Sequence, residues 1–181
     1  MGGKPGPHPL TDWDRQCGFT EGDDVVGERR LEDEAALKLL GARPRWLDFL
    51  DRQYGPSPTH DELVAAITEA VTGADTVASP LGLFHPDHLI TANACFEVAR
   101  KALPEVRWFL YEDVIYRPQA GLTAQAVEWL ENYGFVLKDA SFPEPPAKAK
   151  AIDAYPSQVR GLGRQMEDAY RPERYWELAL R

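Results

Sequence analysis

Cysteine and positive charge are both scarce in this sequence of 181 residues. Its two cysteines, Cys17 and Cys95, are too few for a disulfide-stabilised secreted scaffold and are typical of a reducing compartment. Lys and Arg number 20 against 29 Asp and Glu, so the formal charge is −9. Because nucleic-acid affinity rests largely on neutralising phosphate charge, this balance argues against a nucleic-acid partner.

Long hydrophobic runs are missing as well. Charges or prolines interrupt every apolar stretch well short of the roughly 18 residues that a membrane span needs, and the start of the sequence lacks the basic-then-apolar shape of a secretion signal. No Gly-rich phosphate loop follows a predicted strand, which disfavours a nucleotide-binding module. Hydrophobic residues make up 44% of the chain, as in ordinary globular proteins. We therefore expect one cytoplasmic domain over residues 1–181, without a membrane span.

Helical and strand patterns alternate along the chain. Residues 1–24 are rich in Gly, Pro and Asp without a period, and they predict an irregular loop. Apolar spacing predicts helices at residues 25–40, 59–73, 86–103, 124–133 and over most of the chain from Lys148 onward. Apolar and aromatic runs predict strands at residues 45–50, 76–79, 107–111 and 135–137. This order predicts an α/β fold, a Rossmann-like three-layer α/β/α arrangement with a mostly parallel sheet and sites at the strand ends.

The clearest chemical signal is the run His85-Pro86-Asp87-His88. It lies where the loop after the predicted strand 76–79 becomes a helix, which is a usual place for an active site in such folds. Pro86 suits the first helical position, so His85 falls near the N-cap and His88 one turn later on nearly the same side. Two imidazoles that face one cavity can hold a metal, and Asp87 can orient one ring. The alternative is a pair of histidines that cap the helix and meet solvent.

A catalytic zinc site usually has three protein ligands and an open position, and this run cannot supply all three. Cys95 lies on the His88 side of the helix, but about 10 Å further along its axis, so we expect it in the core. His60, at a predicted helix start, and His8, in the loop-like segment, are weaker candidates.

Four segments occur in an order and spacing that resemble the PIG-L (LmbE-like) family of zinc-dependent N-acetyl-sugar deacetylases, from about Gly27 to Gln158. They are residues 29–41 (RRLEDEAALKLLG), 46–51 (WLDFLD), 80–88 (PLGLFHPDH) and 149–158 (AKAIDAYPSQ). The family patterns fall on Arg29, Glu32, Ala36, Leu40 and Gly41, and on Lys148, Ala151, Ser157 and Gln158. For Glu32, Lys148 and Gln158, a structural role in salt bridging or capping is at least as good an explanation as catalysis.

The resemblance implies roles for five residues. His88 would be a zinc ligand, and His85 would stabilise or protonate the tetrahedral transition state with support from Asp87. Arg29 and Asp51 would contact sugar hydroxyls. From the residues alone, Arg29 is a solvated helix charge and Asp51 a turn-forming carboxylate.

The sequence departs from the family pattern in two places. The first family motif, His-Pro-Asp-Asp-Glu, supplies the remaining zinc ligands and the general base, and it is absent; His8-Pro9-Leu10 is no substitute because no carboxylate pair follows it. Leu83 stands where some members have a tyrosine that donates to the oxyanion. The first residues resemble the loop after the family's second strand, so we expect that the N-terminal strands are missing and the Zn²⁺ site is incomplete.

The sequence thus predicts a metal-dependent deacetylase that hydrolyses the N-acetyl amide of an N-acetylglucosamine-type sugar or glycoconjugate, inactive as this chain stands. Five retained residues favour this interpretation: His85, Asp87, His88, Arg29 and Asp51. The missing motif and Leu83 favour an alternative, a non-catalytic carbohydrate-binding or interaction protein of the same fold that has lost the metal site.

Overall fold

A computed structural model describes residues 2–181, and the chain divides into two compact units. The helical unit comprises the described residues up to Ser57 together with Pro143–Pro172. The sheet unit comprises Pro58–Phe142 and Glu173–Arg181. Each unit is described by itself below.

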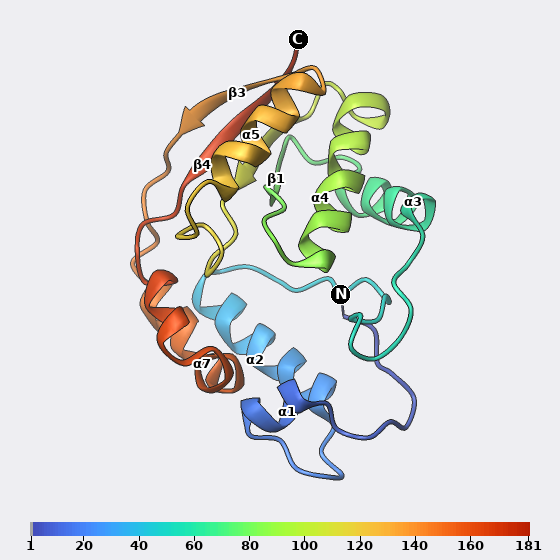
Figure 1. Cartoon of the computed structure of the whole chain (residues 1–181), viewed down its shortest axis with the longest axis vertical. Coiled ribbons are helices and arrows are strands. Elements are labelled where there is room, and N and C mark those ends of the chain that lie inside the picture. Colours follow the sequence, from blue (N-terminus) through green and yellow to red (C-terminus); the bar gives the residue numbers. More distant parts are fainter. Residues whose placement is uncertain (1) are drawn as a thin grey trace. The chain divides into compact units, whose positions relative to one another are not determined.

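The sheet unit is built on four strands (Figure 1). In chain order they are β1 (Thr76–Pro80), β2 (Arg107–Tyr111), β3 (Phe135–Ala140) and β4 (Tyr175–Leu180). Their order in the sheet is β1-β2-β4-β3. Strands β1 and β2 are parallel, whereas β4 runs antiparallel to both β2 and β3. The α/β class is confirmed, but the prediction of a mostly parallel sheet is wrong, because an antiparallel strand from the C-terminal segment enters between β2 and β3.

Strand β4 lies in the stretch from Lys148 onward that we predicted to be mostly helical. Its sequence, YWELAL, contains Glu, Leu and Ala, which are good helix formers. The strand state comes from main-chain pairing on both sides, with Leu178 opposite Trp108 of β2 and Leu137 of β3. Such pairing with distant segments overrides local propensity and leaves little trace in the sequence.

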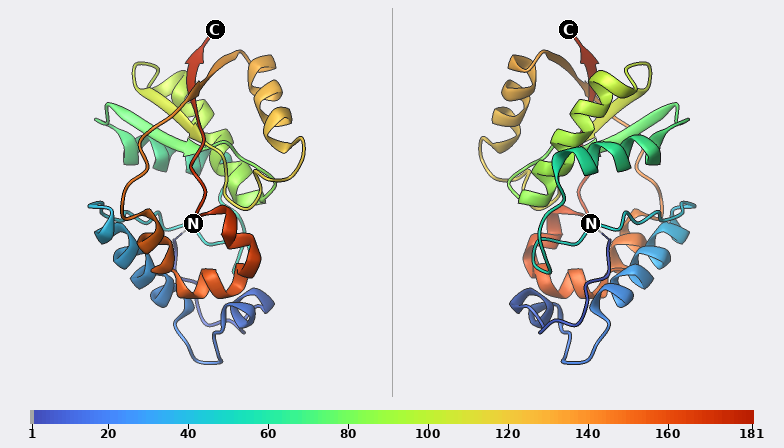
Figure 2. Two further views of the ribbon diagram at one scale, coloured as in Figure 1. Left: turned by 90° about the vertical axis from the view of Figure 1, so that its left-hand side faces the viewer. Right: turned by 90° about the vertical axis from the view of Figure 1, so that its right-hand side faces the viewer.

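The predicted helices of the sheet unit are confirmed. They are α3 (His60–Val71), α4 (Pro86–Glu97), which continues into the π-helical turn η1 (Val98–Ala102), and α5 (Leu122–Asn132). Thr59 and Glu62 form a reciprocal capping box at the start of α3, as their spacing predicts. Helices α3 and α4 lie side by side, and α5 lies away from them against β3 (Figure 2). The most completely buried apolar side chains of this unit include Val98, Leu110, Leu130 and Phe135.

The helical unit contains α1 (Asp12–Cys17), α2 (Val25–Leu39), α6 (Lys148–Asp153), α7 (Pro156–Leu162) and the 3₁₀ turn η2 (Gly163–Asp168). Helix α2 confirms the prediction for residues 25–40. Helix α1 falls inside residues 1–24, so the prediction of an irregular loop there is wrong over this stretch. Thr11 and Asp14 form a capping box that starts the helix. Gly18 ends it with a φ of 96°, which favours glycine.

Residues 45–50 were predicted as a strand and form no part of the sheet. Their backbone instead meets the start of the chain. The main-chain N–H groups of Gly2 and Gly3 donate to the carbonyl oxygens of Leu47 and Phe49 at 3.2 and 2.9 Å. An aromatic-rich run of this kind therefore gives an extended segment without becoming a ladder strand.

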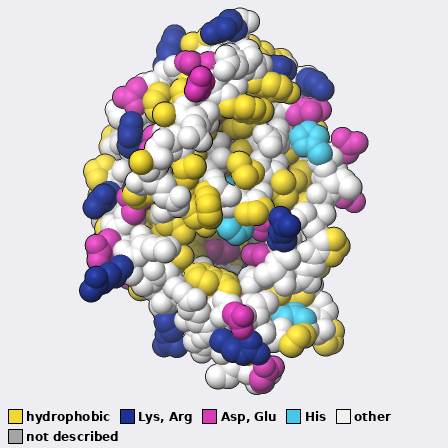
Figure 3. Space-filling view, viewed as in Figure 1, with side chains coloured by type: hydrophobic (Ala, Val, Ile, Leu, Met, Phe, Trp, Pro, Cys, Tyr) yellow, Lys and Arg dark blue, Asp and Glu magenta, His cyan; other side chains and the backbone are white. Residues whose placement is uncertain are grey.

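Lys and Arg side chains are interspersed with Asp and Glu over the face that Figure 3 shows, and they do not gather into one basic patch there. Across residues 2–181, no helix has both the length and the apolar character of a membrane span.

Candidate functional site

The loop from β1 to α4 places the predicted histidines. His85 is the N-cap of α4, and its Nδ1 accepts a hydrogen bond from the main-chain N–H of Asp87 at 3.3 Å. Pro86 takes the first helical position, as its missing N–H and fixed φ favour. The rings of His85 and His88 have centroids 5.2 Å apart, so the structure brings the two imidazoles together. Because Nδ1 of His85 accepts, its neutral ring carries the hydrogen on Nε2 and can donate it outward.

Asp113, two residues beyond the end of β2, is the central residue of this site that sequence reasoning missed. Its side chain is buried, with 1% of its surface exposed. Oδ2 accepts the main-chain N–H groups of Gly82 and Leu83, both at 2.9 Å. Oδ1 lies 2.7 Å from Nδ1 of His88. The two atoms are close but are not aligned for a hydrogen bond. Asp113 thereby fixes the loop before the histidines and faces one side of the His88 ring.

Two aromatic rings flank the histidine pair. The ring centroid of Tyr116 lies 6.3 Å from that of His85 and 5.6 Å from that of His88. The Phe84 ring contacts Tyr116, with 5.3 Å between ring centroids. Burial, with a smaller contribution from the Asp113 carboxylate, raises the pKa of Tyr116. Its phenol therefore stays protonated near neutral pH and remains a hydrogen-bond donor.

Asp87 was predicted to support His85, and the structure places it at the second position of α4. Its main-chain N–H, not its carboxylate, contacts the His85 ring. The side chain is buried, and Oδ1 has no hydrogen-bond partner in this structure. A carboxylate in the first turn of a helix is favoured by the helix dipole, which partly offsets this burial.

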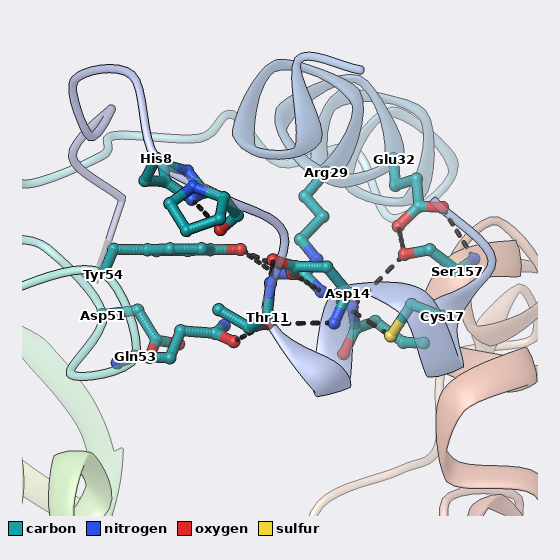
Figure 4. A network of polar contacts seen from close by, with 12 residues as sticks. His8, Thr11, Asp14, Cys17, Arg29, Glu32, Asp51, Gln53, Tyr54 and Ser157 are labelled. Carbon is teal, nitrogen blue, oxygen red and sulfur yellow. Dashed lines mark hydrogen bonds and ion pairs between the residues drawn. The ribbon is translucent and has the colours of Figure 1, made fainter. Parts of the chain in front are cut away.

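Arg29 and Asp51, the predicted sugar contacts, lie in the helical unit (Figure 4). Arg29 donates to the Tyr54 hydroxyl at 3.0 Å and pairs with Asp14 at 3.2 Å. Oδ1 of Asp51 accepts the main-chain N–H of Gln53 at 2.9 Å, which is the turn-forming role. Both side chains line a small hollow of about 100 Å³ together with Tyr54. The structure thus brings Arg29 and Asp51 to one hollow.

Asp14 holds the network around Arg29 together. It is completely buried, and its Oδ1 accepts the Tyr54 hydroxyl at 2.7 Å. Burial alone would raise the pKa of Asp14, but hydrogen bonds from Tyr54 and Thr11 and the charge of Arg29 together lower it. Burial and the bond to Asp14 raise the pKa of Tyr54. The network therefore favours a carboxylate, a phenol and a guanidinium in their ordinary charge states.

The other residues that match the family patterns have structural partners. Glu32 of α2 accepts the main-chain N–H and hydroxyl of Ser157 at 2.8 and 2.6 Å, which caps the start of α7. Lys148 pairs with Glu144 at 2.9 Å, and Gln158 donates to the Ser157 hydroxyl at 3.2 Å. These contacts agree with salt bridging and capping.

The remaining candidate ligands have other surroundings. Cys95 is buried in the core as expected, and burial raises the pKa of its thiol to about 12. His60 pairs with Glu97 at 3.0 Å, and the His8 ring packs on Tyr54 with 4.6 Å between centroids. Leu83 is buried and presents no polar group to the histidine pair.

The donor set does not fit a complete zinc site. Within residues 2–181, no group of three or more His, Cys, Asp or Glu side chains is arranged to hold a metal. His88 faces Asp113 through Nδ1 and offers only Nε2, while Nδ1 of His85 already accepts a main-chain N–H. Because a catalytic zinc takes three protein ligands, these residues supply at most part of a site. The role of His88 as a zinc ligand stays a prediction.

No family model matches the sequence, and no curated protein matches it. Several solved structures do match the chain. The zinc-inhibited form of teicoplanin deacetylase Orf2 is 20% identical with a TM-score of 0.77, covering 100% of this chain and 85% of that chain. The A40926 pseudoaglycone deacetylase Dbv21 is 23% identical with a TM-score of 0.68, covering 99% of this chain and 83% of that chain. The chain therefore has the fold of these deacetylases.

Proposed function

We propose that this chain is an N-deacetylase of the PIG-L (LmbE-like) type, acting on the N-acetyl amide of an N-acetylglucosamine-type sugar or glycoconjugate. The observation that carries the proposal is the imidazole pair at the start of α4, with ring centroids 5.2 Å apart. It occurs on a fold shared with the teicoplanin and A40926 deacetylases. A site of this kind commonly lies where a strand of an α/β fold runs into the following helix.

His85 has a direct role in this proposal. Its Nε2–H donates to the amide oxygen, where negative charge develops as the carbonyl carbon becomes tetrahedral. Asp113 positions the loop before the histidines through its bonds to Gly82 and Leu83, and its other oxygen lies 2.7 Å from Nδ1 of His88. Within the helical unit, Arg29 and Asp51 line one hollow and supply a guanidinium and a carboxylate for sugar hydroxyls. Asp87 supports the His85 end of α4. Turnover requires further donors beyond the part of a zinc site described above, so we expect this chain to bind the sugar without hydrolysing it.

The second candidate is a non-catalytic carbohydrate-binding protein of the same fold. The incomplete donor set favours it. Zinc measured on the purified protein separates the two candidates. Bound zinc favours the deacetylase. Sugar binding by a chain that takes up no added zinc favours the binding protein.

The substitution His85→Ala tests the proposed chemistry in a form of the protein that also carries the His-Pro-Asp-Asp-Glu motif, which the family resemblance implies as the source of the remaining zinc ligands. We expect deacetylation to fall by about a hundredfold or more, because one oxyanion donor is lost, while zinc stays bound. The matched control is His60→Ala, which removes a histidine whose partner is Glu97. Equal rates for His85→Ala and the native protein would remove His85 from the mechanism.

A further inference from the structure

Phe84, in the loop before His85, has two unfavourable features: an exposed apolar ring and a strained backbone. Its ring is 62% exposed although it is large and apolar. Its φ is 59°, in the left-handed region, and the main-chain N–H of His85 donates to the Leu83 carbonyl oxygen at 2.6 Å across it. A three-residue turn of this hand is rare and strained. The fold therefore holds this ring in solvent against both packing and backbone preference.

A second non-glycine residue with a positive φ lies beside Tyr116 in the chain. Ile115 has a φ of 67°, and a β-branched residue in that region is an outlier. Within residues 2–181, Phe84 and Ile115 are the two non-glycine residues with positive φ. Both flank one cluster, because the Phe84 and Tyr116 rings meet at 5.3 Å and Tyr116 lies against both histidines. Backbone strain that converges on one cluster is a mark of a functional site.

The backbone before Phe84 is held by hydrogen bonds. The buried Asp113 carboxylate accepts the N–H groups of Gly82 and Leu83, the residues immediately before Phe84. The Leu81 N–H donates to the Tyr111 carbonyl oxygen at 2.9 Å, which ties the loop to the end of β2. A preformed loop needs less backbone ordering when a ligand covers the Phe84 ring.

The chemistry of the cluster fits one face of a sugar ring. A pyranose presents C–H bonds on its faces and hydroxyl or acylamino groups around its rim. The exposed Phe84 ring and the half-buried Tyr116 ring can cover the C–H surface, and the neighbouring imidazoles can meet the polar rim.

We propose that Phe84 and Tyr116 form a stacking platform for the C–H face of the amino-sugar ring, and so orient its acylamino group toward His85. The proposal rests on the proposed function and adds two residues that determine specificity. Phe84 acts through its aromatic face, and so does Tyr116, whose hydroxyl is not needed for stacking.

Binding to the full chain tests the platform. Kd is measured by NMR titration with methyl N-acetyl-β-glucosaminide and, separately, with N-methylacetamide, which has the amide but no sugar ring. We expect Phe84→Leu and Tyr116→Leu each to weaken sugar binding by about three- to tenfold, with no change for N-methylacetamide. Phe84→Tyr and Tyr116→Phe keep the aromatic face and should bind the sugar as the native chain does. Trp129→Leu, which removes a 48% exposed ring elsewhere in the sheet unit, is the matched control.

Three results would contradict the proposed stacking platform. If the leucine variants bind the sugar as tightly as the native chain, the platform is wrong and the proposed function stands. If they weaken both probes equally, the rings contact the acyl amide and not the sugar ring. If the native chain shows no saturable sugar binding, the platform and the proposed function both fail. Unchanged binding of N-methylacetamide shows that a leucine variant is folded.

Discussion

Replacing Asp113 with alanine is expected to lower the free energy of unfolding by about 3 kcal/mol. The substitution leaves the N–H groups of Gly82 and Leu83 without their acceptor in a buried loop. A buried donor that loses its partner costs about 1–3 kcal/mol, and two donors are affected here. Urea denaturation measures the change, and faster hydrogen exchange at Gly82 and Leu83 would locate it in the loop.

Two further variants sharpen this prediction. Asp113→Asn keeps an acceptor oxygen for the loop, so we expect a smaller loss of about 1 kcal/mol. Glu105→Ala removes an exposed carboxylate from the same unit and should change stability by less than about 0.5 kcal/mol. Unchanged urea midpoints in Asp113→Ala would show that water replaces the carboxylate and that Asp113 does not hold the loop.

Much of the fold follows from short-range signals. Thr59 with Glu62 predicts the start of α3, and Pro86 predicts the start of α4, because caps act within a single turn. The same signal at Thr11 and Asp14 starts α1, although the surrounding Gly and Pro residues suggested a loop. Strand β4 could not be found in this way, because pairing with β2 and β3 determines its state.

In the candidate site too, local spacing identified some residues, whereas others are brought there only by long-range strand pairing. His85 and His88 were found because they share one helical turn, and the structure places their rings together. Asp113 joins them only through the parallel pairing of β1 and β2, which sets Pro80 opposite Tyr111 and brings the two strand ends together. The sequence signal that could have identified Asp113 is its place as an acidic residue just beyond a buried strand. The positive φ of Phe84 could not be predicted from the sequence, because the residue is not a glycine and no local pattern indicates a left-handed backbone there.

Asp14→Ala should destabilise the protein by about 3 kcal/mol or more near neutral pH, since breaking a buried ion pair leaves the surviving charge uncompensated. Arg29 loses its counter-ion, and the Tyr54 hydroxyl loses its acceptor. Urea denaturation near pH 7 measures the loss. The matched control is Asp12→Ala in the same helix, whose fully exposed carboxylate pairs only with Arg15, and whose loss should lie within about 0.5 kcal/mol.

The destabilisation in Asp14→Ala should shrink in acid. Hydrogen bonds and Arg29 hold the pKa of Asp14 below its ordinary value of 3.8, so the unfolded chain takes up the proton first as the pH falls. The stability that the carboxylate contributes is therefore complete above about pH 4 and is lost as the pH falls through the lowered pKa. Urea midpoints of the native protein and the variant should converge as the pH falls from about 4 through the lowered pKa of Asp14. A constant gap over that range would mean that Asp14 acts through its shape and packing, and that its charge contributes nothing to the network.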